Sequence, residues 1–208
     1  MLNSSNENPV SLEYKKRYNR QPQEIKEKLD NFRNTDYQLR VIKKTKPKIK
    51  IGDVFVLSPR ENIYFYGKVL KTNIKTINND NFVEGKQTIF IHKCRSNQIT
   101  LDNFEPNYDD LLINPSIVDI SYWQKGFFYN VGNLPLTDVE KTLDYGFYKF
   151  GIPGIRDGWF CTEEGEKLNH QPRIKGIYGV ATITGISAEI EKEIIMEPLL
   201  IIGNIGDG

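Results

Sequence analysis

The stretch GDVFVLSPRENIYFYGKVL, residues 52–70, decides the fold class of this chain. It reads as two apolar strands joined by the polar segment SPREN (58–62), in which Pro59 and Asn62 are typical turn residues. Such a hairpin has three interpretations: the wall of a catalytic pocket, a platform for nucleic-acid bases, or the first hairpin of a hydrophobic core. The rest of the sequence has to decide among them.

Side chains alternate between the two faces of a β-strand. One face of the second strand therefore carries Ile63, Phe65 and Gly67, and the other carries Tyr64, Tyr66 and Lys68. A glycine inside an apolar strand indicates a β-bulge or a close backbone approach. We expect one of these at Gly67.

Short strands outnumber helices in the remainder of the chain. QTIFIHKC (87–94) is a further strand, and PNYDDLLINP (106–115) is expected to form a short helix that Asn107 caps. Thr137 and Glu140 match the capping box of another short helix, and a last helix is expected after a Ser187 cap. We therefore predict an α+β fold, with a twisted, mainly antiparallel β-sheet and a few short helices.

Charge divides the chain into two parts. Residues 1–50 hold 13 Lys/Arg and 6 Asp/Glu, a net charge of +7, whereas the remaining residues carry a net charge of −6. We predict a basic N-terminal helical arm over residues 1–47 and a second domain over residues 48–208. Residues 1–11 are polar and are expected to be disordered.

The arm is expected to contain one amphipathic helix, over residues 22–33. Ile25, Leu29 and Phe32 fall on one helical face there, and charged side chains fill the other face. A helix docked on the body explains this pattern. An arm that binds RNA or DNA is the alternative, but Glu24, Glu27 and Asp30 interrupt the basic face.

Composition also bears on the cellular compartment. No run of residues approaches the ~18–20 apolar residues of a membrane helix, and the first residues lack the basic-then-apolar pattern of a secretory signal. The two cysteines, Cys94 and Cys161, are too few for a disulfide scaffold. We expect a cytoplasmic protein with reduced thiols and no membrane partner.

Signals for catalysis are weak. The sequence contains no phosphate-binding loop, dinucleotide fingerprint or zinc-protease motif, so no cofactor is expected. His92 and Cys94 share a strand face and are the best nucleophile pair, but no third group orients the imidazole. A metal site would need Asp109, Asp110 and Asp119, although acids on a solvated face are far commoner. We predict no catalytic residue and no metal.

A nucleic-acid surface is the second alternative. Tyr64 and Tyr66 would stack bases if their strand face were open, as on sheets that bind single strands. Tyrosine is also favoured on half-buried sheet surfaces, and an acidic body repels phosphate. A nucleic-acid partner is therefore not expected.

Residues 96–124 form the segment with the most one-sided charge, because they contain five acidic residues and no lysine or arginine. Aromatic side chains beside charge of a single sign are typical of a protein–protein site, in which aromatics anchor the partner and charge steers it. A solvated loop over a core is the competing interpretation. The residues that we predict to bind a partner protein are Asp102, Glu105, Tyr108, Asp109, Asp110 and Asp119.

The order of several short motifs resembles the Imm26 family of bacterial immunity proteins. The resemblance rests on Gly52-Asp53-Val54-Phe55, on Tyr66-Gly67-Lys68-Val69 and on Gly132-Asn133-Leu134-Pro135-Leu136, with the strand TIFIHK between the second and third. It covers about residues 48–195 and leaves out the basic arm.

The resemblance implies a cytosolic antitoxin that binds a cognate toxin of a polymorphic or contact-delivered toxin system and neutralises it without catalysis. It offers no catalytic or toxin-contacting residue to carry over. A phosphotriesterase description has also been attached to the family, which keeps a small hydrolase as an alternative. An acidic surface would suit a basic nuclease toxin, because carboxylates would occupy its phosphate-binding cleft.

Overall fold

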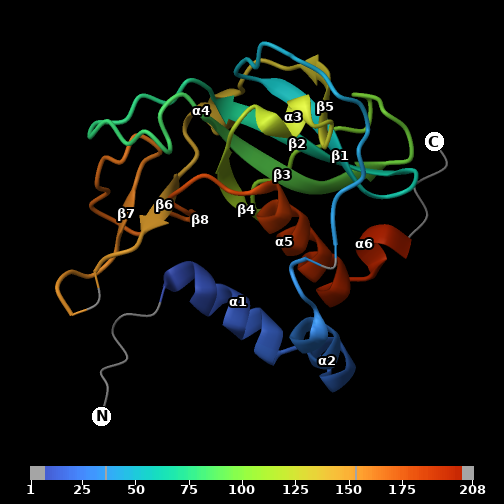
Figure 1. Ribbon diagram of the computed structural model, residues 1–208, viewed down its shortest axis with the longest axis horizontal. Coiled ribbons are helices and arrows are strands. Elements are labelled where there is room, and N and C mark those ends of the chain that lie inside the picture. The colour runs from blue at the N-terminus through green and yellow to red at the C-terminus, as the bar shows by residue number, and fades with distance from the viewer. Residues whose placement is uncertain (1–7, 36, 153, 203–208) are drawn as a thin grey trace.

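The computed structural model describes residues 8–35, 37–152 and 154–202, and Figure 1 gives its element labels. The helices are α1 (Pro9–Asn19), α2 (Gln23–Asn31), α3 (Ser121–Gln124), α4 (Asp138–Lys141), α5 (Ile183–Met196) and α6 (Leu199–Ile202). The strands are β1 (Asp53–Arg60), β2 (Ile63–Lys71), β3 (Gln87–Ser96), β4 (Leu111–Val118), β5 (Phe128–Asn133), β6 (Tyr145–Lys149), β7 (Trp159–Cys161) and β8 (Ile174–Ile177).

Residues 52–70 form the hairpin that the sequence predicts. The turn is shorter than expected, because β1 continues through Pro59 to Arg60 and pairs with β2 again at Ile63. Asn62 has a φ of 55°, the left-handed conformation that asparagine tolerates in tight turns. Pro59 lies where the register of the pair shifts, a position at which a strand tolerates its missing N–H.

Two sheets make up the β structure. The five-stranded sheet has the order β4-β3-β2-β1-β5, with every neighbouring pair antiparallel. The three-stranded sheet has the order β7-β6-β8, in which β6 and β8 run parallel. A parallel bridge joins Ile117 of β4 to Val180, which follows β8 in the chain. The predicted α+β fold with a mainly antiparallel sheet is confirmed.

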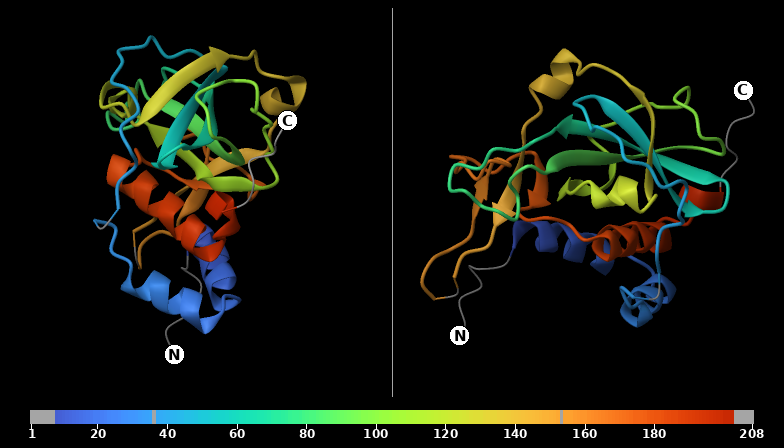
Figure 2. Two further views of the ribbon diagram at one scale, coloured as in Figure 1. Left: turned by 90° about the vertical axis from the view of Figure 1, so that its right-hand side faces the viewer. Right: turned by 45° about the horizontal axis from the view of Figure 1, so that its top comes forward.

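The main core lies between the large sheet and the C-terminal helix α5, which crosses beneath the sheet (Figure 2). Ile186, Ile190 and Ile194 of α5 pack against Phe55, Phe65 and other side chains from one face of β1–β3. Tyr122 and Trp123 of α3 close the same core, where both rings contact Phe128. This buried apolar surface is the chief stabilising contribution to the fold.

The bulge predicted at Gly67 is confirmed, whereas the close neighbour there is a side chain and not the backbone. The β2–β3 register shifts between Phe65 and Gly67, and the Phe55 ring of β1 lies against Gly67 from the cross-strand position. A Cβ atom on Gly67 would lie 2.2 Å from Cζ of Phe55. Only glycine therefore leaves room for the tip of this aromatic ring.

The N-terminal arm differs from the prediction in two ways. It contains two helices instead of one, and Pro9–Ser11, expected to be disordered, begin α1; residues 1–7 of that prediction lie outside the described residues. Asn8 caps α1 by accepting from the Val10 amide at 2.9 Å, and proline is favoured in a first helical turn. The arm also reaches the main core through Leu39. The domain boundary at residue 47 stays a prediction.

Two other predicted helices need correction. Residues 106–115 do not form a helix, because Leu111 already begins β4; the Asn107 side chain instead accepts from the Asp109 amide at 2.9 Å in a turn. Helix α5 begins at Ile183 with Thr182 as its cap, so Ser187 lies inside it. The Ser187 hydroxyl instead accepts from the Leu39 amide and donates to the Ile183 carbonyl.

The capping box of Thr137 and Glu140 is confirmed in α4, where each side chain bonds the backbone amide of the other residue. Within the part of the chain that the structure describes, no helix has the length and apolar character needed to cross a membrane.

Candidate functional site

The segment between β3 and β4 (residues 97–110) covers the outer face of the large sheet. Leu101 and Phe104 from this segment pack on Tyr66, whose ring centroid lies 5.8 Å from that of Phe104. Tyr66 is 0% exposed, so the interpretation of Tyr64 and Tyr66 as an open platform for stacking bases is wrong. The outer face of the hairpin is a second, smaller core.

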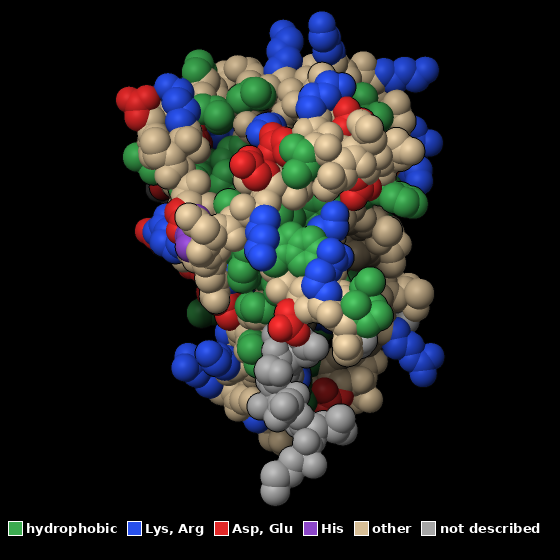
Figure 3. Space-filling view, turned by 90° about the vertical axis from the view of Figure 1, so that its left-hand side faces the viewer, with side chains coloured by type: hydrophobic (Ala, Val, Ile, Leu, Met, Phe, Trp, Pro, Cys, Tyr) green, Lys and Arg blue, Asp and Glu red, His purple; other side chains and the backbone are tan. Residues whose placement is uncertain are grey.

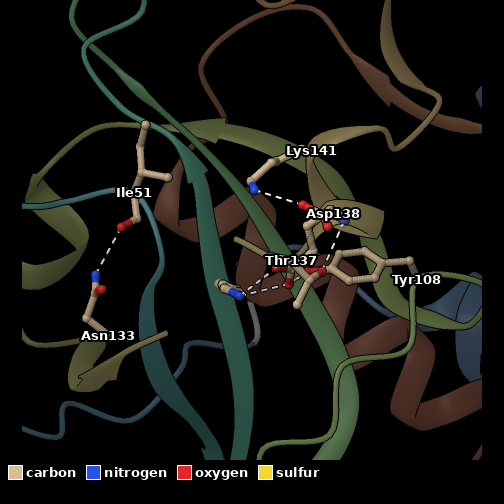
Figure 4. Close-up of polar contacts among 8 residues, drawn as sticks. Ile51, Tyr108, Asn133, Thr137, Asp138 and Lys141 are labelled. Carbon is tan, nitrogen blue, oxygen red and sulfur yellow. Dashed lines mark hydrogen bonds and ion pairs between the residues drawn. The ribbon is translucent and has the colours of Figure 1, made fainter. Parts of the chain in front are cut away.

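Beneath this segment lies a buried ion pair. Lys68 of β2 donates to both carboxylate oxygens of Glu140 in α4 at 2.8 Å, and each side chain is only 2% exposed. Tyr108 donates its hydroxyl hydrogen to the same carboxylate, and the Thr137 amide donates to it at 2.8 Å. Figure 4 shows Tyr108 and Thr137 converging on this carboxylate.

The contacts of Glu140 decide its charge. Burial alone would raise the pKa of its carboxyl, but hydrogen bonds from Lys68, Tyr108 and Thr137 outweigh burial and hold that pKa below its usual value. Burial and the neighbouring carboxylate both raise the pKa of the Tyr108 hydroxyl. Tyr108 is thus a fixed, neutral hydrogen-bond donor, and its ring position is set by Glu140.

The acidic residues next to Tyr108 form ion pairs with basic side chains, although residues 96–124 themselves contain no lysine or arginine. Asp109 forms an ion pair with Arg173, which directly precedes β8. Asp110 pairs with Lys93 of β3 at 2.8 Å, and Lys93 also reaches Glu197 at 2.8 Å. Folding therefore brings basic side chains from other elements to this surface, which a linear charge count cannot anticipate.

The other predicted binding residues lie further away along the chain. Asp102 and Glu105 are exposed in the segment before β4, where Asp102 accepts from the Thr100 hydroxyl at 2.7 Å. Asp119 follows the opposite end of β4 and accepts from the Ser121 amide at 2.8 Å, at the start of α3. The structure thus brings together Tyr108, Asp109 and Asp110, and places Asp119 at the far end of the strand.

A carboxylate metal site is not formed by the predicted acids. Asp109 and Asp110 precede β4 and Asp119 follows it, so the three side chains do not converge. Among the described residues there is no group of three or more histidine, cysteine, aspartate or glutamate side chains that could hold a metal ion.

His92 and Cys94 do not make a nucleophile pair. Burial raises the pKa of the Cys94 thiol to about 11, so the thiolate that attack requires is scarce at neutral pH. His92 is 0% exposed, and its Nδ1 faces the Asn107 carbonyl oxygen at 3.3 Å. Burial lowers its pKa to about 4, so the ring is neutral at pH 7.

A second exposed surface lies at the end of the molecule that carries the small sheet. Hydrophobic side chains gather in the middle of the face seen in Figure 3, with lysine and arginine side chains around them. On the loops near this end, Phe82 is 82% exposed and Ile155 is 80% exposed.

Sequence reasoning also missed Lys68 and Glu140 as partners. Each carried a signal: Lys68 is a charged residue inside a strand rich in apolar and aromatic residues, and Glu140 closes a capping box. A buried lysine requires a buried acid, but nothing in the sequence indicates which of the 27 acids supplies it.

Comparison with known proteins adds the family. A family model described as Imm26, Immunity protein 26, matches residues 50–156, which include the hairpin, β3, the acidic segment and α4. Searches of curated proteins and of solved structures give no significant match. The matched segment spans half of the 208 residues and agrees with the resemblance of the motifs, and the chain therefore belongs to the Imm26 family of immunity proteins.

Proposed function

We propose that this chain is a cytoplasmic antitoxin that binds and neutralises a cognate bacterial toxin domain without catalysing a reaction. Its membership in a family of immunity proteins carries the proposal. The binding surface is the acidic surface, defined as Asp102, Glu105, Tyr108, Asp109 and Asp110. A partner that also contacts Asp119 has to extend along the whole of β4.

The geometry of Tyr108 supports this choice of surface. Interfaces use aromatic side chains that are already held in place, because ordering a free side chain on binding costs free energy. The buried Glu140 carboxylate holds the Tyr108 hydroxyl, while the phenol ring stays partly accessible beside Asp109. Tyr108 is therefore a pre-positioned anchor in the acidic surface.

The ion pairs of Asp109 and Asp110 do not prevent binding to a basic partner. Arg173 and Asp109 are both largely exposed, and exposed pairs contribute at most about 1 kcal/mol. A lysine or arginine of the toxin can replace such a partner at little cost. A toxin with a basic cleft, such as a nuclease, fits this surface best.

The hydrolase alternative receives little support from the contacts of its candidate residues. The Cys94 thiol is protonated at neutral pH, and the predicted carboxylates do not converge. A direct test is hydrolysis of phosphotriesters and simple esters, with Cys94→Ala as the control variant. Turnover that disappears in this variant would favour an enzyme.

The antitoxin proposal is tested with the toxin domain encoded beside this chain. Co-expression of the chain is expected to restore growth of cells that produce this domain, and calorimetry with the purified proteins is expected to give a stable complex. The doubly charge-reversed variant Asp109→Lys, Asp110→Lys is expected to weaken binding at low salt and to flatten its salt dependence.

Asp157→Lys is the matched control. Asp157 is exposed in the loop between β6 and β7. This loop follows the end of β6, whereas Arg173 precedes the start of the parallel strand β8, so the two residues lie at opposite ends of the small sheet. This variant is expected to bind like the natural chain. If binding instead fails with Phe82→Ser or Ile155→Ser and survives charge reversal at Asp109 and Asp110, the toxin uses the small-sheet end and not the acidic surface.

A further inference from the structure

A groove opens beside the acidic surface. It has a volume of about 930 Å³ and is bounded by β4 and α5, by β8, and by α1 of the N-terminal arm. Tyr108, Asp109 and Asp110 line it. A second cavity of about 280 Å³ continues along β4 and shares Val10, Asn114, Ile177 and Glu189 with the groove. The combined space runs along a strand edge, and the groove alone falls in the size range of ligand clefts.

The floor of this groove is the free edge of the large sheet. β4 is the terminal strand in the order β4-β3-β2-β1-β5. Gly176 of β8 lies against the Pro115 carbonyl oxygen, and the Ile117 carbonyl accepts from the Ala181 amide at 2.8 Å, so the chain at and after β8 covers this edge from Pro115 onward. Between residues 111 and 114 we find no main-chain hydrogen bond across this edge to another described residue. Unpaired strand edges are templates for an added strand.

Several of the charged side chains that line the groove form ion pairs with one another. Glu13 of α1 pairs with Lys175 of β8, and Arg17 of α1 pairs with Glu193 of α5. Glu189, one turn before Glu193, is different, because it forms no ion pair among the described residues. Solvent reaches Glu189 through the groove, yet the surrounding protein raises the pKa of its carboxyl, mainly by loss of hydration. Lys192 offsets this only in part.

From this juxtaposition we propose that an extended, basic segment of the toxin adds to the edge of β4 as a further strand, with one lysine or arginine paired to Glu189. The inference rests on the proposed function and names the mode of recognition. Main-chain hydrogen bonds to residues 111–114 supply affinity, and side-chain sites along the groove supply selectivity, as in other strand-addition complexes. Asp109 and Asp110, at one end of the groove, lie where further cations of the segment would pass.

Helix α1 has a defined part in this arrangement. It forms the wall opposite β4 and is tied to the body through two ion pairs, Glu13 with Lys175 and Arg17 with Glu193. Lys175 and Glu193 are each only 10% exposed, and Val10 of α1 packs in a small core with Tyr148 and Phe160. Helix α1 is therefore a fixed wall, and the added strand has to enter the space that the groove already offers.

Hydrogen–deuterium exchange of the complete chain, free and bound to the toxin domain, tests this mode. Among residues 111–114, the amides that point away from β3 are expected to exchange at least tenfold more slowly in the complex. Glu189→Lys is expected to weaken toxin binding by tenfold or more, and Glu189→Gln by a smaller factor, because glutamine keeps hydrogen bonding without charge. Glu191→Lys, on the same helix, is the matched control; Glu191 pairs with Arg60 away from the groove.

The outcomes separate this inference from the proposed function. If the toxin is neutralised and bound, but the amides of residues 111–114 exchange as in the free chain and Glu189→Lys binds normally, strand addition is wrong and the antitoxin function stands. If the toxin domain neither binds nor is neutralised, both proposals fall. Slower exchange at β4 together with a specific loss in Glu189→Lys supports both.

Discussion

Lys68 and Glu140, 72 residues apart in the chain, face each other at 2.8 Å in a site from which water is almost excluded. Removing one charge leaves the other buried without a partner, which costs about 3–5 kcal/mol in comparable pairs. Lys68→Met and Glu140→Gln are each expected to lower the free energy of unfolding by an amount in this range. Urea denaturation followed by circular dichroism measures the loss.

The double variant is the matched control for these changes. Glutamine still caps α4 and can accept from Tyr108, and methionine fills the volume of the lysine stem. Lys68→Met with Glu140→Gln is therefore expected to recover most of the stability lost in either single variant. Equal losses in all three variants would show that packing, and not the unpaired charge, is responsible.

His92 makes stability depend on pH. Its pKa is about 4 in the folded chain, against 6.5 for the free side chain, because the ring is buried. Above pH 6.5 both states hold a neutral ring, whereas between pH 6.5 and 4 the unfolded chain binds a proton that the folded chain does not. The stability of the natural chain relative to His92→Gln should therefore fall with acidification, by up to about 1.4 kcal/mol per pH unit. Denaturation midpoints at pH 5 and 7 measure it; parallel curves for the two proteins would refute it.

Glu189 is expected to act in the opposite direction. The pKa of its carboxyl is raised to about 7, so the folded chain holds a proton that the unfolded chain releases above pH 4.5. Stability relative to Glu189→Gln should fall as the pH rises from 4.5 to 7 and stay level above that. Lys192 and Glu193 of α5, Glu13 and Arg17 of α1 and Lys175 of β8 line the same groove. Thermal unfolding of both proteins across this pH range is the measurement. A stability difference between the two proteins that stays constant with pH would contradict the raised pKa of Glu189.

Gly67 and Phe55 are expected to be coupled. A methyl group on Gly67 collides with the Phe55 ring, and such overpacking costs about 1–3 kcal/mol. Gly67→Ala should lower the unfolding temperature, and combining it with Phe55→Leu should cost less than the sum of the two single losses. Additive losses would mean that the two residues do not interact.

Local patterns in the sequence predicted much of the sheet. The hairpin of residues 52–70, its two faces and the special role of Gly67 follow from the alternation of side chains and from one glycine, which are properties of neighbouring residues. The short helix α4 was predictable for the same reason, since a capping box needs only Thr137 and Glu140. The family followed from the order of such motifs.

The errors came from contacts between distant residues. Residues 111–113 are three consecutive apolar residues. Such a short run is compatible with a helix or a strand, and here its pairing with β3 makes it extended. The local sequence pattern therefore predicted a helix where an edge strand forms. The acidic segment seemed free of cations because Lys93 and Arg173 reach it only after folding. Helix α1 has little apolar periodicity and was missed, although Asn8 and Pro9 mark its start.

The contact of Leu39 with Ser187 spans 148 residues and closes the main core. One face of the large sheet stays uncovered until α5 is made, so a chain growing on the ribosome has to carry an exposed apolar surface through most of its synthesis. Synthesis of α5, and not completion of the first hairpin, therefore sets the moment at which the main core can close.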